Sequence, residues 1–229
     1  MSINTTPGNT IKDNAEITTT EWDMLTPNEP IEAEPWTDFP DAYEEIDERE
    51  DINGVPQTVW RGERLYLDNI DELGKRSIST VGHEAKSNRE GETFLSRDKK
   101  YASLYAVGTD GVTFYDSPLP KEKIPIGVIY KIDNTGNRIG ATPTDDSPEP
   151  FGQFAGKFRE FTTDQEIPPS YYSVSEVYIM DDFVQPNGHK RSDFRRPLEV
   201  FHVKDQKDLP RIIQAIKSRM DELDSQRVQ

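Results

Sequence analysis

The feature that most restricts the fold of this chain is the uneven distribution of charge and proline along its length. Residues 1–56 hold 15 acidic and 2 basic side chains and six prolines, whereas the rest of the chain holds 28 acidic and 25 basic side chains. A segment so acidic and rich in proline buries too little apolar surface to offset the entropy it loses on ordering. We therefore expect an acidic, largely disordered tail over residues 1–56 and one folded domain over residues 57–229.

The composition argues against several classes of function. The domain has almost balanced charges, so we expect no non-specific binding of nucleic acid. The chain has no cysteine, and His83, His189 and His202 are too scattered for a recognisable metal site, so we predict no metal ion. No apolar run approaches the ~20 residues of a membrane span, and the first residues lack the pattern of a signal peptide, so we predict no contact with a membrane.

The hydrophobic pattern predicts an α+β fold with several short strands and few helices. Residues 58–61, 93–96, 126–132, 175–180 and 197–203 are typical of strands, whereas 98–107, 152–159 and 208–226 are typical of helices, with one helical turn at 69–73. Asp98 is in the position of an N-cap residue for the first helix. The last helix is amphipathic, with an apolar stripe formed by Leu209, Ile212, Ile213, Ile216, Met220 and Leu223.

Three polar residues lie in or beside these elements within recognisable local patterns. Arg61 follows Val59-Trp60 and precedes an acid, Glu63, by two residues. Ser96 ends the run Phe94-Leu95-Ser96 and is followed by the predicted helix, which carries Tyr101-Ala102 and Tyr105-Ala106. Glu160 stands seven residues before Ile167-Pro168-Pro169, which leads into a valine-containing strand.

Taken in this order, the three patterns resemble those of the pertussis-toxin-like and cholera-toxin-like mono-ADP-ribosyltransferases. The strand Gly127-Val-Ile-Tyr130, followed by Asn134, is similar to a middle strand of the pertussis-toxin-like group, and the resemblance covers roughly residues 57–183. It implies an ADP-ribosyltransferase-like split β-sandwich with flanking helices. It also implies an enzyme that cleaves NAD as a substrate and transfers ADP-ribose to another protein.

The resemblance assigns a role to each matching residue. Glu160, Ser96 and Arg61 are the expected catalytic residues, and the expected NAD-binding residues are Arg61, Glu63, His83, Phe94, Ser96 and Tyr101. The bond between nicotinamide and ribose breaks through a state resembling an oxocarbenium ion, which a fixed carboxylate such as that of Glu160 would stabilise. The guanidinium of Arg61 would suit the diphosphate, and Ser96 would orient Glu160 through a hydrogen bond.

The sequence departs from the family pattern at two places. Members that modify arginine carry Glu or Gln two residues before the catalytic Glu, where this chain has Phe158, which argues against arginine as the acceptor. A hydroxyl such as that of threonine, on ubiquitin or another protein, is therefore an open acceptor. Arg97 and Asp98 replace the second and third residues of the family's Ser-Thr-Ser.

The resemblance implies a bacterial toxin or secreted effector that acts in the host cytoplasm on a host protein. The Ser/Thr/Asn-rich first residues are typical of an export signal, so a secretion chaperone is a candidate partner. Two alternatives stay open. One is an NAD glycohydrolase on the same fold, and the other is a catalytically inactive binding module that uses the acidic tail.

Overall fold

The computed structural model describes residues 31–37, 54–79, 92–107, 120–143, 160–180 and 197–227, and the structural statements below concern these ranges. The described residues belong to one compact unit, Ile31–Gln229. Part of the predicted acidic tail, residues 31–37, therefore belongs to the same unit as the domain expected at residues 57–229.

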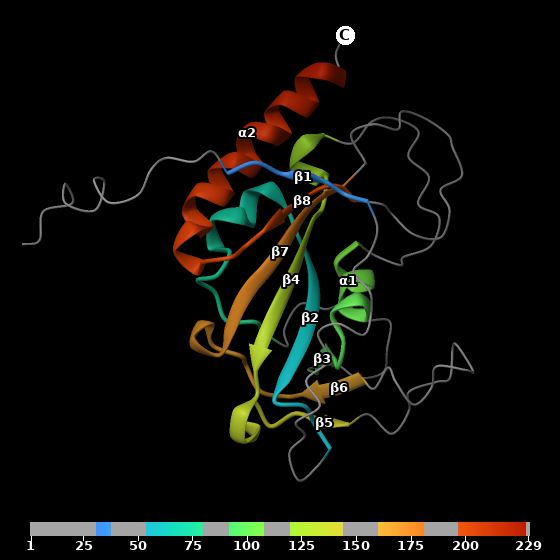
Figure 1. Cartoon of the computed structure of the whole chain (residues 1–229), viewed down its shortest axis with the longest axis vertical. Coiled ribbons are helices and arrows are strands. Elements are labelled where there is room, and N and C mark those ends of the chain that lie inside the picture. The colour runs from blue at the N-terminus through green and yellow to red at the C-terminus, as the bar shows by residue number, and fades with distance from the viewer. Residues whose placement is uncertain are drawn as a thin grey trace, which may run out of the picture. The chain divides into compact units, whose positions relative to one another are not determined.

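The described elements comprise eight strands, two α-helices and short 3-10 helices (Figure 1). The strands are β1 (Glu34–Pro35), β2 (Thr58–Leu65), β3 (Thr93–Ser96), β4 (Ile126–Asp133), β5 (Thr142–Pro143), β6 (Glu160–Thr163), β7 (Tyr172–Met180) and β8 (Pro197–His202). The α-helices are α1 (Lys99–Val107) and α2 (Leu209–Arg227). The 3-10 helices are η2 (Leu67–Glu72), η3 (Lys121–Lys123), η4 (Thr135–Asn137), η5 (Pro169–Tyr171) and η7 (Gln206–Asp208).

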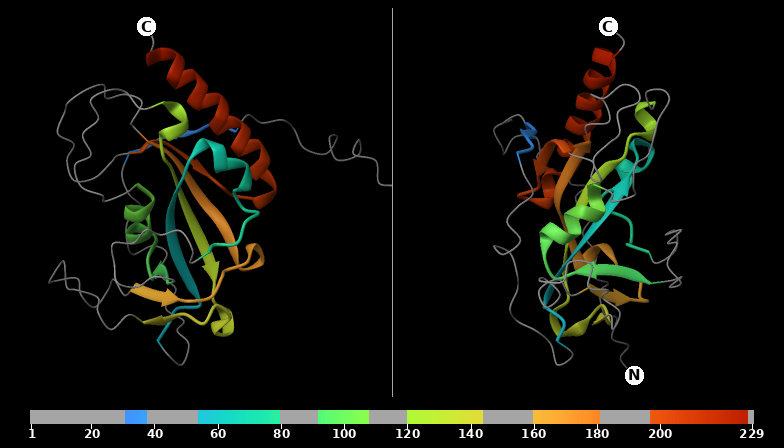
Figure 2. Two further views of the ribbon diagram at one scale, coloured as in Figure 1. Left: turned by 180° about the vertical axis from the view of Figure 1, so that it is seen from behind. Right: turned by 90° about the vertical axis from the view of Figure 1, so that its right-hand side faces the viewer.

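The eight strands form one antiparallel sheet in the order β1-β8-β7-β4-β2-β3-β6-β5. The prediction of a mixed α+β fold is therefore confirmed. Strands β2 and β4 pair along eight residues, whereas β2 and β3 share only the pair Trp60 and Ser96. Strands β5 and β6 run across the direction of β2, β4 and β7 in views from front and back (Figures 1 and 2). The sheet thus changes direction where β3 leaves β2.

The larger core lies on the face of the sheet that α2 covers. Alternate residues of β2 and β4, such as Val59 and Val128, point to this face because side chains alternate along a strand. The predicted helix 208–226 is confirmed as α2, and all six residues of its apolar stripe are buried in this core. Burying such a stripe against a sheet is what stabilises an amphipathic helix of this kind.

The smaller core lies on the opposite face, beneath α1. It contains the buried residues Trp60, Ala102, Ala106, Val107, Ile129, Tyr178, Met180 and Val200. Helix α1 lies directly on β2 at Gly62, where an added Cβ would be only 1.8 Å from the carbonyl oxygen of Ala102. The lack of a side chain at this position therefore allows the helix to pack on the backbone of the strand.

Three strands were not predicted from the sequence. Strand β1 lies within the predicted tail and pairs Glu34 with Val200 at the edge of β8. Strands β5 and β6 are short, and their period-two patterns span too few residues to be recognised. The helix expected at 152–159 lies outside the described residues.

Candidate functional site

Ser96 and Glu160, which are far apart in the sequence, lie side by side in the sheet. Ser96 is the direct partner of Glu160 on β6 and also the direct partner of Trp60 on β2. Directly opposed residues of antiparallel strands place their side chains on the same face of the sheet. Glu160, Ser96 and Trp60 therefore share the face that α1 covers, at the point where β3 leaves β2.

The carboxylate of Glu160 is held by two tyrosines of α1. The Tyr101 hydroxyl donates a hydrogen bond to Glu160 Oε1 at 2.9 Å, and the Tyr105 hydroxyl donates to the same oxygen at 2.5 Å. Residues four apart lie on one side of a helix, and the two rings form an edge-to-face pair with centroids 5.5 Å apart. Burial and the nearby Glu160 raise the pKa of Tyr101 to about 12, so its hydroxyl stays protonated and can donate at neutral pH.

The hydroxyl of Ser96 takes part in the turn between β3 and α1. Ser96 Oγ donates to the carbonyl oxygen of Asp98 at 2.9 Å and accepts from the Asp98 amide at 3.2 Å. In the described structure these bonds replace the hydrogen bond that we expected between Ser96 and Glu160. The reason is local: the chain turns immediately after Ser96 and brings the backbone of Asp98 within reach of its hydroxyl.

Asp98 is confirmed as the cap of α1, because its Oδ1 accepts a hydrogen bond from the Tyr101 amide at 2.7 Å. Its side chain is buried, and Oδ2 has no hydrogen-bond partner among the described residues. Burial raises the pKa of Asp98 to about 6, although the bond from Tyr101 opposes this shift. The cap fixes the first turn of the helix that carries both tyrosines.

Arg61 points to the opposite face of β2 from Trp60. Its side chain is only 3% exposed, and Nη1 donates to the carbonyl oxygen of Phe94 at 3.0 Å. This bond ties β2 to β3 beyond their single residue pair. Burial lowers the pKa of Arg61, and the charge of Glu63 opposes this effect. The structure thus brings Ser96, Glu160 and Tyr101 together and directs the guanidinium of Arg61 to the other side of the sheet.

Glu63 lies on the same face as Arg61 and forms an ion pair with Arg76, which the sequence had not indicated as a site residue. Tyr172 donates from its hydroxyl to the carbonyl oxygen of Arg76 at 2.6 Å. Arg76 thus neutralises this carboxylate, whose charge also acts on the pKa of Arg61. A sequence signal for Arg76 is lacking, because it lies in the irregular segment after η2.

Of the remaining predicted site residues, the structure describes Phe94 but not His83. Phe94 is half-buried and, two residues before Ser96 on β3, lies on the face of Glu160. His83, and also Phe158 of the family comparison, lie outside the described residues.

A second group of charged residues lies beneath α1, towards β7 and β8. Lys99 Nζ is 2.8 Å from Glu176 Oε1, and both side chains are almost completely buried. Tyr178 donates from its hydroxyl to Glu176 Oε2, and His202 Nδ1 lies 3.2 Å from Glu176 Oε1. Burial alone would raise the pKa of Glu176, but these contacts outweigh it and lower the pKa to about 2.

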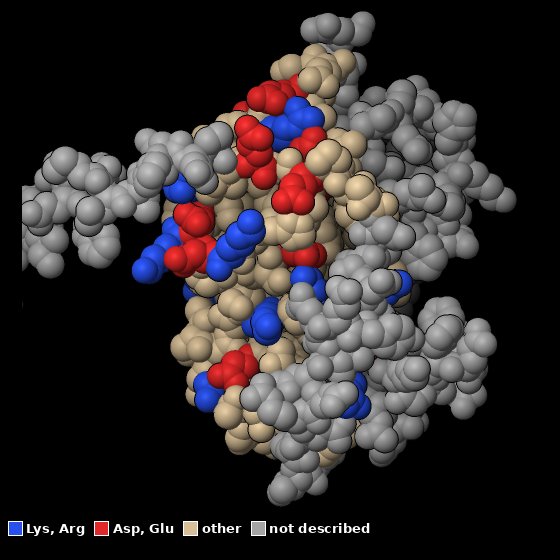
Figure 3. Space-filling model, in the orientation of Figure 1, with Lys and Arg blue, Asp and Glu red and all other residues tan. Residues whose placement is uncertain are grey.

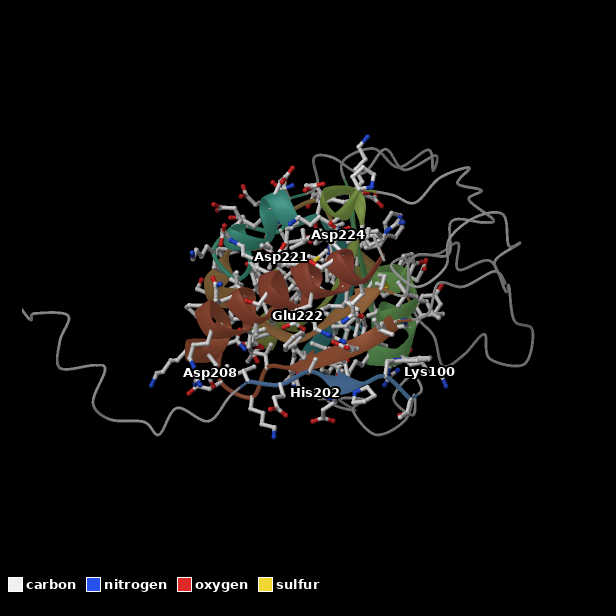
Figure 4. All side chains as sticks on the ribbon, turned by 90° about the horizontal axis from the view of Figure 1, so that it is seen from above. Lys100, His202, Asp208, Asp221, Glu222 and Asp224 are labelled. Carbon is white, nitrogen blue, oxygen red and sulfur yellow. The ribbon has the colours of Figure 1, made fainter. Side chains whose placement is uncertain are left out.

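His202 extends this group to the edge of the sheet beside β1 (Figure 4). Its Nε2 lies 3.8 Å from Glu34 of β1, and its hydrogen bond with Glu176 raises its pKa. The sequence carries no local sign of this group, since its members come from separate elements and only strand pairing brings them together.

Within the described ranges, no three His, Asp or Glu residues gather in a way that could hold a metal ion. The same part of the chain has no helix that is both long and apolar enough to span a bilayer. Acidic and basic side chains are interspersed on the face that carries α2 (Figure 3), and ion pairs such as Arg219 with Glu199 neutralise many of them.

Taken together, the site offers a carboxylate held by two phenol hydroxyls, beside a half-buried aromatic ring. Such a group can stabilise positive charge that develops on a bound ligand. Comparisons of the chain with models of protein families, with curated proteins and with solved structures found no match.

Proposed function

We propose that this chain is a mono-ADP-ribosyltransferase that cleaves NAD and transfers ADP-ribose to a protein, on a split β-sandwich of the pertussis-toxin-like and cholera-toxin-like type. One observation carries the proposal. Three motifs that are far apart in the sequence meet where β3 leaves β2, with Ser96 paired to both Trp60 and Glu160. The order of the motifs in the sequence does not by itself require this meeting.

In the proposed reaction, Glu160 faces the ribose that bears nicotinamide. As the bond to nicotinamide lengthens, positive charge grows on the ribose, and the carboxylate stabilises it. Tyr101 and Tyr105 fix the position of the carboxylate through their hydrogen bonds to Oε1. A preorganised group of this kind costs little reorganisation as the charge develops.

Arg61 and Ser96 support this arrangement in different ways. Arg61 fastens β3 to β2 through the carbonyl of Phe94. Its guanidinium lies on the opposite face of the sheet from Glu160, so the contact with the diphosphate that was expected from the sequence is not part of this proposal. Ser96 holds the turn that starts α1, and so sets where the tyrosines lie relative to Glu160. We also retain His83 and Phe94 as predicted NAD-binding residues, whereas Glu63 lies on the face of Arg61, paired with Arg76.

The proposed acceptor is a hydroxyl group of a host protein, because Phe158 cannot receive a proton from an arginine acceptor. The proposed setting is a bacterial effector in the host cytoplasm, with a secretion chaperone as a further candidate partner. An NAD glycohydrolase and an inactive binding module are the competing functions, and one experiment separates all three.

The test is to incubate the full chain with a cell lysate and NAD labelled in its adenylate phosphate. We expect label on protein, and a loss of about 100-fold or more in Glu160→Gln, because loss of an electrostatic contact to a transition state costs that much. Glu166→Gln is the matched control: this exposed acid lies six residues along the same segment and should leave labelling unchanged.

Each other outcome has a clear meaning. Label that appears only as free ADP-ribose would show that water is the acceptor and would replace the transferase with a glycohydrolase. Absence of NAD cleavage by the unaltered chain would contradict both enzymes and leave the binding module. Equal labelling by the chain and Glu160→Gln would remove Glu160 from the reaction.

A further inference from the structure

A row of directly paired residues crosses the sheet on the face that carries Glu160. Glu160 pairs with Ser96, Ser96 with Trp60, Trp60 with Lys131 of β4, and Lys131 with Ser173 of β7. Since paired residues share a face, all five side chains lie on the α1 side of the sheet. The row therefore places a cation, Lys131, on the same surface as the candidate catalytic carboxylate.

Lys131 is exposed, and no ion pair with it is formed by the described residues. Its amino group lies 5.2 Å from the centre of the Trp60 ring. The acid nearest to it along its own strand and on the same face, Asp133, holds Arg138 at 3.0 Å and the Thr135 amide at 2.8 Å. The charge of Lys131 is thus not matched by the acid on its own strand.

Two other cations near this row have different roles. Lys99 also approaches the Trp60 ring, at 5.4 Å, but it is buried and neutralised by Glu176 at 2.8 Å. Arg61 lies on the opposite face of β2 and bonds to the backbone of Phe94. Of these three cations, Lys131 is the one that is exposed and faces the side of Glu160.

We propose that Lys131 binds the diphosphate of the dinucleotide whose ribose faces Glu160. This inference rests on the proposed function. Three strand spacings of about 4.8 Å separate the backbone of Lys131 from that of Glu160 by at most about 14 Å, since the sheet bends between them. The lysine side chain and the arm of the dinucleotide between its ribose and diphosphate together span this separation. Ser173, the next residue in the row, has its side chain on the same face.

The test measures NAD binding to the full chain by titration calorimetry. We expect Lys131→Gln to raise the dissociation constant about tenfold, as for loss of a hydrogen bond to a charged group, and Lys131→Arg to stay within about threefold of the unaltered chain. Added salt should weaken binding less in Lys131→Gln, because one charge contact is missing. Lys123→Gln is the matched control, since this exposed lysine in η3 lies just before the far end of β4.

The outcomes separate this inference from the proposed function. If the unaltered chain binds NAD and Lys131→Gln binds it equally well, the lysine has no role and the proposed function stands. If the unaltered chain binds no NAD, both are overturned. If Lys123→Gln weakens binding as much as Lys131→Gln, the effect is one of general charge, and the specific contact is refuted.

Discussion

Replacing Glu176 by Gln tests the charged group that fastens α1 to β7. Glu176 accepts contacts from Lys99, Tyr178 and His202 in a buried setting. Its pKa falls from the ordinary 4.5 to about 2 on folding. That difference corresponds to roughly 3 kcal/mol of stability at neutral pH. We expect Glu176→Gln to lower the free energy of unfolding by about this amount. The variant loses the charge of the carboxylate, and it also leaves the buried charge of Lys99 uncompensated.

The pH dependence gives the second half of this prediction. Because folding lowers the pKa of Glu176, its contribution is fully present above about pH 4.5 and is lost as the pH falls through about 2. The same two pKa values leave about 1.4 kcal/mol at pH 3. The difference in stability between the chain and Glu176→Gln should therefore shrink to less than half between pH 7 and pH 3.

The assay is equilibrium urea unfolding, followed by far-ultraviolet circular dichroism at both pH values. Glu72→Gln is a matched control, because this exposed acid should change stability by less than about 0.5 kcal/mol. A Glu176→Gln variant as stable as the unaltered chain at pH 7 would refute the reasoning. So would a difference that stays constant down to pH 3, because the carboxylate would then contribute nothing through its charge.

Further predictions concern the packing of α1, the edge of the sheet and the site itself. Gly62→Ala should destabilise the domain by about 3 kcal/mol in thermal unfolding, because the new methyl group overlaps a backbone carbonyl of α1; an unchanged midpoint would show that the helix moves freely. Contact with the buried Glu176 carboxylate raises the pKa of His202. The stabilising charge of His202 is therefore fully present below about pH 6.5, and it is lost as the pH rises through the raised pKa. Between pH 6 and 9, the free energy of unfolding should fall less in His202→Gln than in the unaltered chain. Tyr101→Phe should reduce NAD cleavage about tenfold with little change in NAD affinity, and a weakening of affinity alone would contradict its role in holding Glu160.

The two faces of β2 make different contributions to the structure. On the α1 face, the strand contributes to the row that links Glu160 with Lys131. On the other face, Arg61 ties the strand to β3. A substitution at Arg61 should therefore affect the junction between β2 and β3.

The sequence by itself determined those elements whose signals are local. The apolar stripe of α2 repeats along one helix. Asp98 caps α1 by accepting a hydrogen bond from the amide of Tyr101, only three residues further along the chain. The long strand β4 was also predictable, since its apolar residues are contiguous. Each of these signals lies within a few residues of the element that it specifies, so no knowledge of distant partners is needed.

Only the tertiary structure decided what meets at the site. Ser96 and Glu160 were both candidates in the sequence, but their direct pairing depends on the register between β3 and β6. A shift of that register by one residue would place Glu160 on the other face of the sheet, and no local pattern fixes strands of four residues. The same holds for the tyrosines on Glu160 and for Lys99 beside Glu176. Those contacts join segments that lie far apart in the chain, and chain folding alone brings them within bonding distance.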